Sequence, residues 1–274
     1  MEINIGESIR DGITGVLKGT REVAAGIVDV VSATIVKTLE GVKDVQVAIN
    51  SVIVGTISIA IKAAGAIGAD LTIVAKNSII GAIEGVHKIG IVTADMFRDT
   101  VCEAVKTTAE IGGDVESVIK SAIVGAIKGT RDVTVSSEEA VAEAARGAIR
   151  AVSEVGVDMS AAAKNAVKGA IGGVAETSGS LAGVIKNTSK GLVLETSQIG
   201  GDVAVIAKSA VTGAIEAARE IGLSAEEAAS AAAKGAIEAA KTIGGEAGLA
   251  ISKAVTGTIS GIKVIVKEPF EKEN

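Results

Sequence analysis

Gly213-Ala-Ile-Glu-Ala-Ala-Arg-Glu-Ile-Gly-Leu-Ser-Ala-Glu-Glu-Ala-Ala-Ser-Ala-Ala-Ala-Lys234 is the stretch of sequence that decides the fold. Its opening Gly-Ala-Ile returns 22 residues later at Gly235, and the same step can be followed to both ends of the chain. The repeated position holds glycine at Gly15, Gly81, Gly125, Gly147, Gly169, Gly191, Gly213, Gly235 and Gly257, and another residue at Lys37, Ile59 and Glu103. A fixed period over twelve copies without insertion indicates a tandem-repeat protein.

Within each repeat the spacing of apolar residues is that of a helix. In the copy that follows Asp114, apolar or small residues recur at steps of three and four from Val115 to Val133. This spacing predicts a helix of about 19 residues whose apolar face is wide enough to pack against neighbours on two sides. We expect twelve helices, at 5–23, 27–45, 49–67 and so on to 247–265.

The junctions between repeats carry signals for the end of one helix and the start of the next. Gly222 is suited to a left-handed position after a helix, Ser224 to the N-cap of the next, and Glu227 to the third place of a capping box. The same N-cap position is occupied by Asn4, Asp70, Asp114, Ser136, Asp158, Ser180, Asp202 and Ser224. Aspartate and serine alternate over most of these junctions, so a 44-residue period is superimposed on the 22-residue one, as in helical hairpins.

A second architecture explains the same spacing. Twenty-two is twice eleven, and an 11-residue apolar repeat produces long right-handed coiled-coil helices. The chain has a single proline, Pro269, and junctions such as Val45-Gln-Val-Ala48 contain little turn chemistry. The caps favour hairpins, and the alternative of continuous hendecad helices stays open from sequence alone. The pattern resembles α-helical solenoids over the whole chain without the signatures of any one family, so the resemblance implies a fold and no activity.

Composition restricts the classes of function. The chain is 48% hydrophobic with two Phe, no Tyr or Trp, a net charge of −6 and one cysteine, Cys102. Scattered basic residues and the lack of aromatics argue against nucleic-acid binding, and a lone cysteine excludes an intramolecular disulfide and zinc-ligand motifs. No signal peptide is visible at the first residues, which favours a cytoplasmic location. The stretch closest to a transmembrane helix, Val45 to Ile61, contains several polar residues, and we interpret it as a buried repeat.

Few residues are candidates for chemistry. His87 occupies a polar-face position, Cys102 the edge of the apolar face, and Met96 and Phe97 core positions. The acidic pairs Glu138-Glu139 and Glu226-Glu227 follow serine caps, where the helix dipole favours acid without catalysis. Gly112-Gly113-Asp114 and Gly200-Gly201-Asp202 lack the lysine and the preceding strand of a nucleotide-binding loop. Lysines at one- or two-repeat spacing (Lys120, Lys164, Lys186 and Lys208) indicate a solvated face, or a contact for an acidic partner or lipid headgroups.

These observations predict one array of twelve helices over residues 1–266 and a short polar tail over residues 267–274. We expect a non-enzymatic scaffold with no catalytic, cofactor-binding or metal site, which self-associates through apolar Ala/Gly/Val/Ile helix faces. The first helix is charged enough to cap the array, whereas the last carries few polar groups, so we expect homo-oligomers or filaments formed through that end. The alternative is an amphipathic helical protein that binds a lipid surface or an apolar ligand such as an acyl chain or quinone, with possible membrane association.

Overall fold

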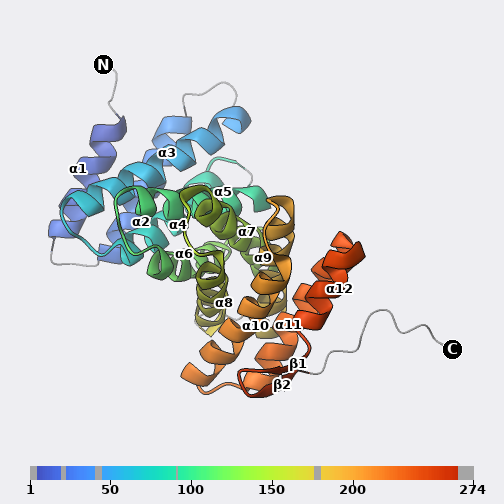
Figure 1. The fold of residues 1–274 in the computed structure, drawn as a ribbon. Coiled ribbons are helices and arrows are strands. Elements are labelled where there is room, and N and C mark those ends of the chain that lie inside the picture. Colours follow the sequence, from blue (N-terminus) through green and yellow to red (C-terminus); the bar gives the residue numbers. More distant parts are fainter. Residues whose placement is uncertain (1–4, 20–22, 41–44, 91, 176–179, 265–274) are drawn as a thin grey trace.

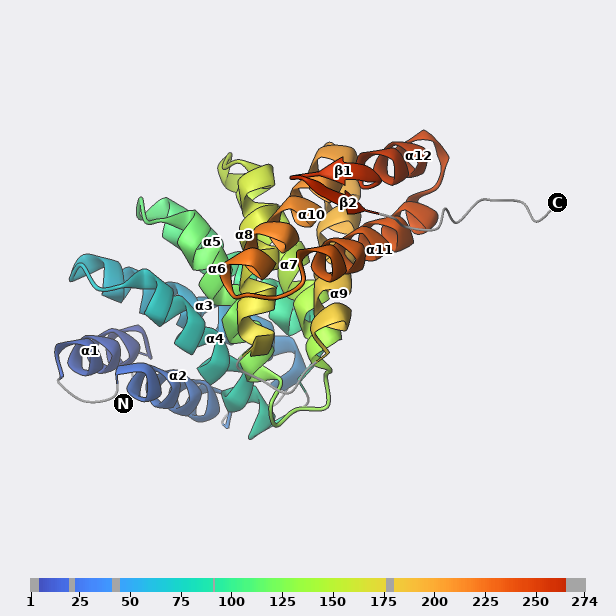
Figure 2. The same ribbon diagram turned by 90° about the horizontal axis from the view of Figure 1, so that it is seen from below.

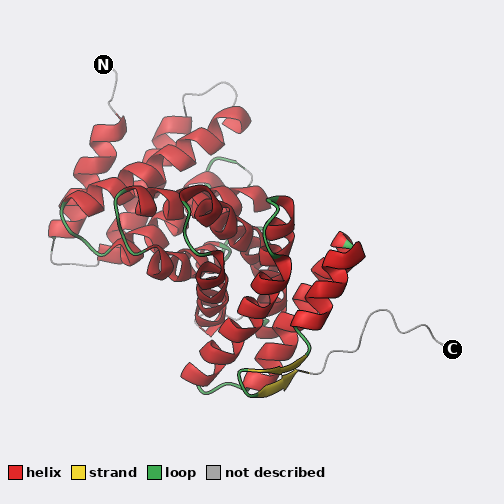
Figure 3. Ribbon diagram, viewed as in Figure 1, coloured by secondary structure: helices red, strands yellow, loops and turns green. Residues whose placement is uncertain are grey.

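The computed structural model describes residues 5–19, 23–40, 45–90, 92–175 and 180–264, and these form twelve α-helices and one β-hairpin (Figures 1 and 3). The helices are α1 (Ile5–Lys18), α2 (Val23–Leu39), α3 (Val45–Ala66), α4 (Leu71–His87), α5 (Ala94–Glu110), α6 (Val115–Gly129), α7 (Ser137–Val155), α8 (Met159–Ala175), α9 (Leu181–Gln198), α10 (Val203–Glu220), α11 (Ala225–Ile243) and α12 (Gly245–Ala254). The strands are β1 (Gly257–Ile259) and β2 (Ile262–Val264).

The helices form two layers. Each odd-numbered helix packs on the odd-numbered helices before and after it, and the even-numbered helices pack on one another in the same way. Consecutive helices are antiparallel hairpins that join the layers. In both views α1 and α12 lie at opposite ends of the resulting curved array (Figures 1 and 2). The all-α repeat array predicted from the 22-residue period is therefore confirmed.

Continuous hendecad helices are wrong for this chain, because the described helices end at the junctions. Gly222 has φ +75°, and the amide of Leu223 donates to the carbonyl of Ala218 across it at 2.8 Å, which closes the end of α10. The amide of Glu227 then donates to Ser224 Oγ at 3.2 Å and opens α11. A helix stop followed at once by a start leaves no continuous helical backbone at this junction.

The predicted N-caps are confirmed wherever the residues are described. Side chains of Asp70, Asp114, Ser136, Asp158, Ser180, Asp202 and Ser224 each accept a hydrogen bond from an amide two or three residues on. Asn4 lies outside the described residues. The next helix after α4 is capped differently, since its N-cap is Thr93 and its side chain makes no capping hydrogen bond.

The repeated glycines hold neighbouring helices of one layer close together. A Cβ added at Gly125 would lie 2.7 Å from the carbonyl oxygen of Lys76, which is 49 residues earlier in the preceding even helix. The same register brings Gly147 against Arg98 in the odd layer and Gly213 against Lys164 in the even layer. A methyl group does not fit at these distances. The glycines therefore cost helix propensity and allow a backbone contact that alanine would prevent.

The C-terminal end differs from the predicted twelfth helix over 247–265. Helix α12 stops at Ala254, and β1 and β2 pair antiparallel after it, with buried Ile259 and Val264. Ser260 (φ 48°) and Gly261 (φ 80°) form the turn, and two positive φ values are what a tight type I′ hairpin needs. The hairpin packs on α10 and α11, so this end is not the weakly capped helix expected from sequence. The predicted tail, 267–274, lies outside the described residues.

At the other end, α1 carries the charged outer face that the sequence predicts. Glu7, Arg10, Asp11 and Lys18 are exposed, and Ile9 and Ile13 are buried against the array.

One helix is long and apolar enough to span a membrane by length and composition. This stretch, Ala48–Ala66, lies within α3, and 44% of its apolar window is buried. In the described chain α3 packs against α1, α2, α4 and α5, as a member of the array. Its composition is a weak hint of membrane association, and the cytoplasmic location stays a prediction.

Candidate functional site

Polar side chains between neighbouring odd helices form a ladder of ion pairs. Lysine on one helix pairs with glutamate 48 residues later on the next, as in Lys62–Glu110 at 3.1 Å and Lys190–Glu238 at 3.5 Å. In the even layer Lys168 pairs with Glu216 at 2.8 Å in the same register, and this hydrogen bond raises the pKa of the Lys168 ammonium. The ladder follows from the 44-residue unit, because equivalent positions in successive helices face one another.

The most buried part of the ladder is a charged cluster between α7 and α9. Glu195 is fully buried and accepts hydrogen bonds from Arg146 Nε at 3.1 Å and from Arg150 Nε at 2.7 Å. In other copies its repeat position holds glycine or alanine, such as Gly173, Ala217 and Ala239. Two guanidinium groups therefore satisfy a carboxylate at a position that is otherwise reserved for small residues.

A Glu–Asn pair fills the space beside these rungs at two helix contacts. Asn165 Nδ2 donates to Glu116 Oε2 at 3.1 Å between α6 and α8, and Asn187 Nδ2 donates to Glu138 Oε2 at 3.3 Å between α7 and α9. Adding 44 to 138 and 187 gives Ala182 and Ala231, on α9 and α11. Both side chains of the pair are thus reduced to methyl groups at the last contact of the odd layer.

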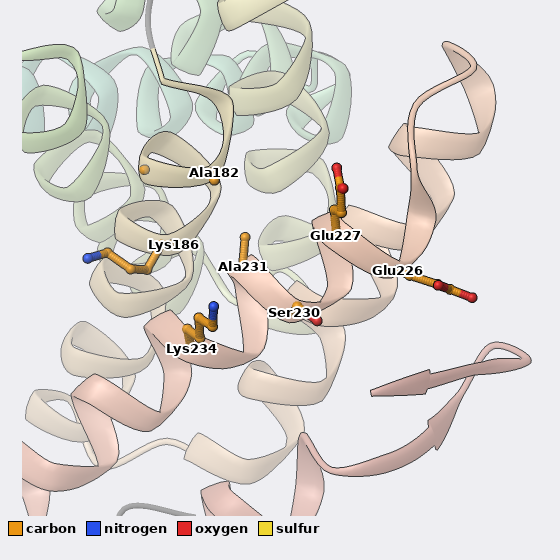
Figure 4. A pocket seen from close by; sticks show the side chains of 8 residues that line it. Ala182, Lys186, Glu226, Glu227, Ser230, Ala231 and Lys234 are labelled. Carbon is orange, nitrogen blue, oxygen red and sulfur yellow. The ribbon is translucent and has the colours of Figure 1, made fainter. Parts of the chain in front are cut away.

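A groove of about 660 Å³ lies where this pair is missing (Figure 4). Its apolar floor consists of Ala182, Gly183 and Ala231. Lys186 and Lys234 lie at one end, and Glu226 and Glu227, in the first turn of α11, lie at the other. Ser230 completes the lining. Small residues facing each other across α9 and α11 explain the hollow.

A smaller apolar cavity of about 180 Å³ adjoins the groove. It lies between the layers and is lined mainly by Ile171, Leu181, Ile185, Ala218, Leu223 and Ala228. The two cavities share Ala182 and Glu227 in their linings. A charged groove is thereby placed next to an apolar one.

The structure separates the lysines that the sequence analysis had placed in one row. Lys120, Lys164 and Lys208 belong to the even helices α6, α8 and α10, whereas Lys186 belongs to α9 in the odd layer and lines the groove. Alternation of the layers explains the separation, because a 22-residue step changes layer and a 44-residue step does not.

The other residues considered from sequence lie apart from the groove, with Glu226 and Glu227 as the exception. His87 is exposed at the end of α4, and Phe97 is fully buried, as predicted. Cys102 is half-buried, and burial, with a smaller contribution from the Glu154 carboxylate, raises the pKa of its thiol to about 11. Glu138 is taken up by Asn187. Among the described residues no group of three metal-ligating side chains is close enough to hold an ion.

A line of aliphatic side chains follows one edge of the array. They stand at 44-residue steps at the C-terminal ends of successive odd helices. We call this the aliphatic edge: Ile67, Ile111, Val155, Ile199 and Ile243. Ile67, Ile111 and Ile199 are 40%, 37% and 36% exposed, and the other two are partly buried. Regular spacing makes the edge a continuous apolar feature and distinguishes it from isolated surface residues.

Neither the groove nor the aliphatic edge was identified from sequence. A signal for the groove was present, since Glu138 and Asn187 become Ala182 and Ala231 one 44-residue unit later. Using that signal requires the 49-residue register between neighbouring helices, which only the packing reveals. No protein-family model matches the chain, and no curated protein matches it in sequence.

Proposed function

We propose that this chain is a non-enzymatic scaffold that self-associates into homo-oligomers through the aliphatic edge. The observation that carries the proposal is the run of Ile and Val at 44-residue steps along the ends of the odd helices. The helix faces first expected to associate are used within the chain, where one continuous cluster of buried aliphatic residues runs through the array. The edge is the extended apolar feature that packing leaves partly open to solvent.

The geometry of the edge suits a two-fold contact. Equal spacing along one line lets the same residues of two copies meet in antiparallel fashion, as a closed dimer requires. Its β-branched side chains are stiff, so burying them costs little side-chain entropy. The charged side chains of the odd layer are largely paired within the ladder, which limits the desolvation that such a contact would demand.

Light scattering coupled to size-exclusion chromatography tests the proposal. We expect an oligomer at micromolar concentration, and we expect the double variant Ile111→Thr/Ile199→Thr to be monomeric. The matched control is Ile73→Thr/Val205→Thr, which changes equally exposed residues of the even layer, 37% and 46%, and should leave the oligomer intact. A monomeric wild type would overturn the proposal.

Association through the C-terminal end is the competing arrangement. Leu249 on α12 is 64% exposed, the most of the large hydrophobic residues described. If Leu249→Ser dissolves the oligomer and the Ile111→Thr/Ile199→Thr variant does not, the copies meet end to end and the aliphatic edge is not their interface.

A further inference from the structure

The groove between α9 and α11 breaks the charge rule of the ladder. Elsewhere in the described ladder, lysines such as Lys62, Lys106, Lys168 and Lys190 pair with a glutamate 48 residues later. The residue 48 positions after Lys186 is Lys234, on the facing helix. Two lysines therefore face each other across the groove in a register that otherwise brings opposite charges together.

The charges around this end do not cancel. Glu238 is the carboxylate paired with Lys186, at 3.3 Å, and it also pairs with Lys190, at 3.5 Å. Among the described residues Lys234 has no ion-pair partner. Three ammonium groups thus share one carboxylate. Figure 4 shows Glu226 pointing away from the lysines, at the far end of the groove. The lysine end is a local excess of positive charge on a protein whose net charge is −6.

The space beside the lysines is apolar and unfilled. Ala182 and Ala231 replace a carboxylate and an amide that occupy the equivalent volume between α7 and α9. The adjoining 180 Å³ cavity has room for about six times the roughly 30 Å³ that one water molecule occupies in the liquid. Its aliphatic lining suits a short hydrocarbon chain. A ligand with a charged end and an apolar tail would satisfy both parts at once.

We propose that the α9–α11 groove binds a small amphipathic carboxylate. The carboxylate lies between Lys186 and Lys234, in place of the glutamate that the ladder lacks at position 234. The apolar chain passes over Ala182 into the cavity lined by Leu181, Ile185 and Leu223. A carboxylate is favoured because it is the group that satisfies lysine at the other rungs. The site lies at the N-terminal halves of α9 and α11 and contains no residue of the aliphatic edge, so it is independent of self-association.

Octanoate, below its micellar concentration, is the probe for the full-length protein. Calorimetric titration and amide NMR shifts should show binding of one octanoate per chain, with shifts at Gly183 and Ala231. Acetate, which lacks the chain, and octanol, which lacks the charge, should each bind at least about tenfold more weakly, a difference of about 1.4 kcal/mol. Equal binding of acetate or octanol, or no binding of octanoate at millimolar concentration, would overturn the proposal.

Two variants taken from the chain's own pattern test the site without unfolding it. Lys234→Glu restores the rule of the ladder, and Ala182→Glu/Ala231→Asn rebuilds the Glu–Asn pair that fills the groove between α7 and α9. Each should reduce octanoate affinity at least about tenfold and keep or raise the thermal midpoint. The control Lys208→Glu makes the same charge change on the even layer and should bind octanoate like the wild type. Wild-type affinity in the filled-groove variant would place the ligand elsewhere.

Flotation with vesicles separates a free carboxylate from a membrane lipid as the source of the chemistry. We expect the protein to stay unbound with vesicles of neutral lipid and with vesicles containing anionic phospholipid, while octanoate still binds. Flotation with anionic vesicles that Lys234→Glu abolishes, without binding of free octanoate, would overturn the proposal in favour of a lipid surface.

Discussion

Gly147 lies against the main chain of Arg98 so closely that a methyl group on its α-carbon would overlap the Arg98 carbonyl oxygen. The two residues are 49 apart and belong to neighbouring odd helices. Their contact sets the spacing that brings the ion-pair ladder into register. The glycine therefore acts on packing between helices more than on the conformation of its own helix.

Alanine at position 147 should destabilise the array. Gly147→Ala adds a methyl group where none fits, and overpacking of this kind costs about 1 to 3 kcal/mol. Gly15 is the matched control, since it holds the same repeat position in α1, which has no earlier helix, and nothing lies within 4 Å of its added Cβ. Gly15→Ala should stabilise by up to about 1 kcal/mol through helix propensity alone. Urea unfolding followed by circular dichroism measures both, and effects of the same sign would contradict the packing argument.

The junction before α11 should be sensitive to the loss of either of its signals. Gly222→Ala places a side chain at φ +75°, and Ser224→Ala removes the hydroxyl that accepts from Glu227, so each should cost about 1 kcal/mol. Gly172→Ala is the control, because Gly172 is inside α8 with nothing within 4 Å of an added Cβ, and it should stabilise. Thermal or urea unfolding that showed stabilisation by both junction variants would mean that the helix runs on.

Removal of Glu195 should cost far more than removal of an exposed carboxylate of the ladder. Glu195→Ala leaves Arg146 and Arg150, both partly buried, without the acceptor they share, and we expect a loss of about 2 to 4 kcal/mol. Glu238→Ala breaks two ion pairs whose side chains are about one-third exposed, and should cost no more than about 1 kcal/mol. Similar losses in urea unfolding would show that burial of Glu195 is energetically unimportant.

Part of the acid sensitivity should come from the aspartate caps. Hydrogen bonds from the Ser117 hydroxyl and amide lower the pKa of Asp114 below 3.8. A lowered folded-state pKa contributes stability above the unfolded value, and that contribution is lost as pH falls through the folded one. Asp114→Ser keeps a capping oxygen, as at Ser136, but cannot titrate. It should lose less stability than wild type between about pH 5 and pH 2, measured by thermal midpoints. Asp29→Ser, at an exposed site within α2, is the control, and an equal reduction there would rule out the cap.

Cys102 should react slowly in the folded protein. Its pKa of about 11 leaves little thiolate at pH 8, and the thiolate is the nucleophile. Alkylation by iodoacetamide should therefore be slow in buffer and fast in urea, as mass spectrometry would show. Labelling at equal rates in both would mean that the thiol is open to solvent and not held in the packing.

The sequence predicts most helix positions because the same signals recur at each junction. Ser224, Asp202 and Asp114 each mark a helix start that the structure places at the same residue. The prediction fails at Gly257, which occupies the repeat position but has φ +89° and begins a strand. There the local sequence, alternating β-branched residues around Ser260-Gly261, prevails over the long period. The long period masked a hairpin signal that was present.

The groove was beyond prediction for a different reason. Its defining residues, Ala182 and Ala231, are ordinary small residues of the repeat when each is considered alone. They matter because they are 49 apart and replace Glu138 and Asn187 of the preceding unit. A period shows which positions are equivalent, whereas contact between two copies depends on how far one helix slides along the next. That offset follows from backbone contacts at glycines such as Gly235.

Alternation of the layers determines how such a chain can grow or shrink. A duplication or loss of 44 residues in phase would return every helix to its own layer, with each glycine facing the carbonyl that accommodates it. A change of 22 residues would place an odd helix beside even ones and bring ladder lysines against the wrong partners. The 22-residue motif is the unit of sequence, but the hairpin is the smallest unit of inheritance that keeps every interface matched.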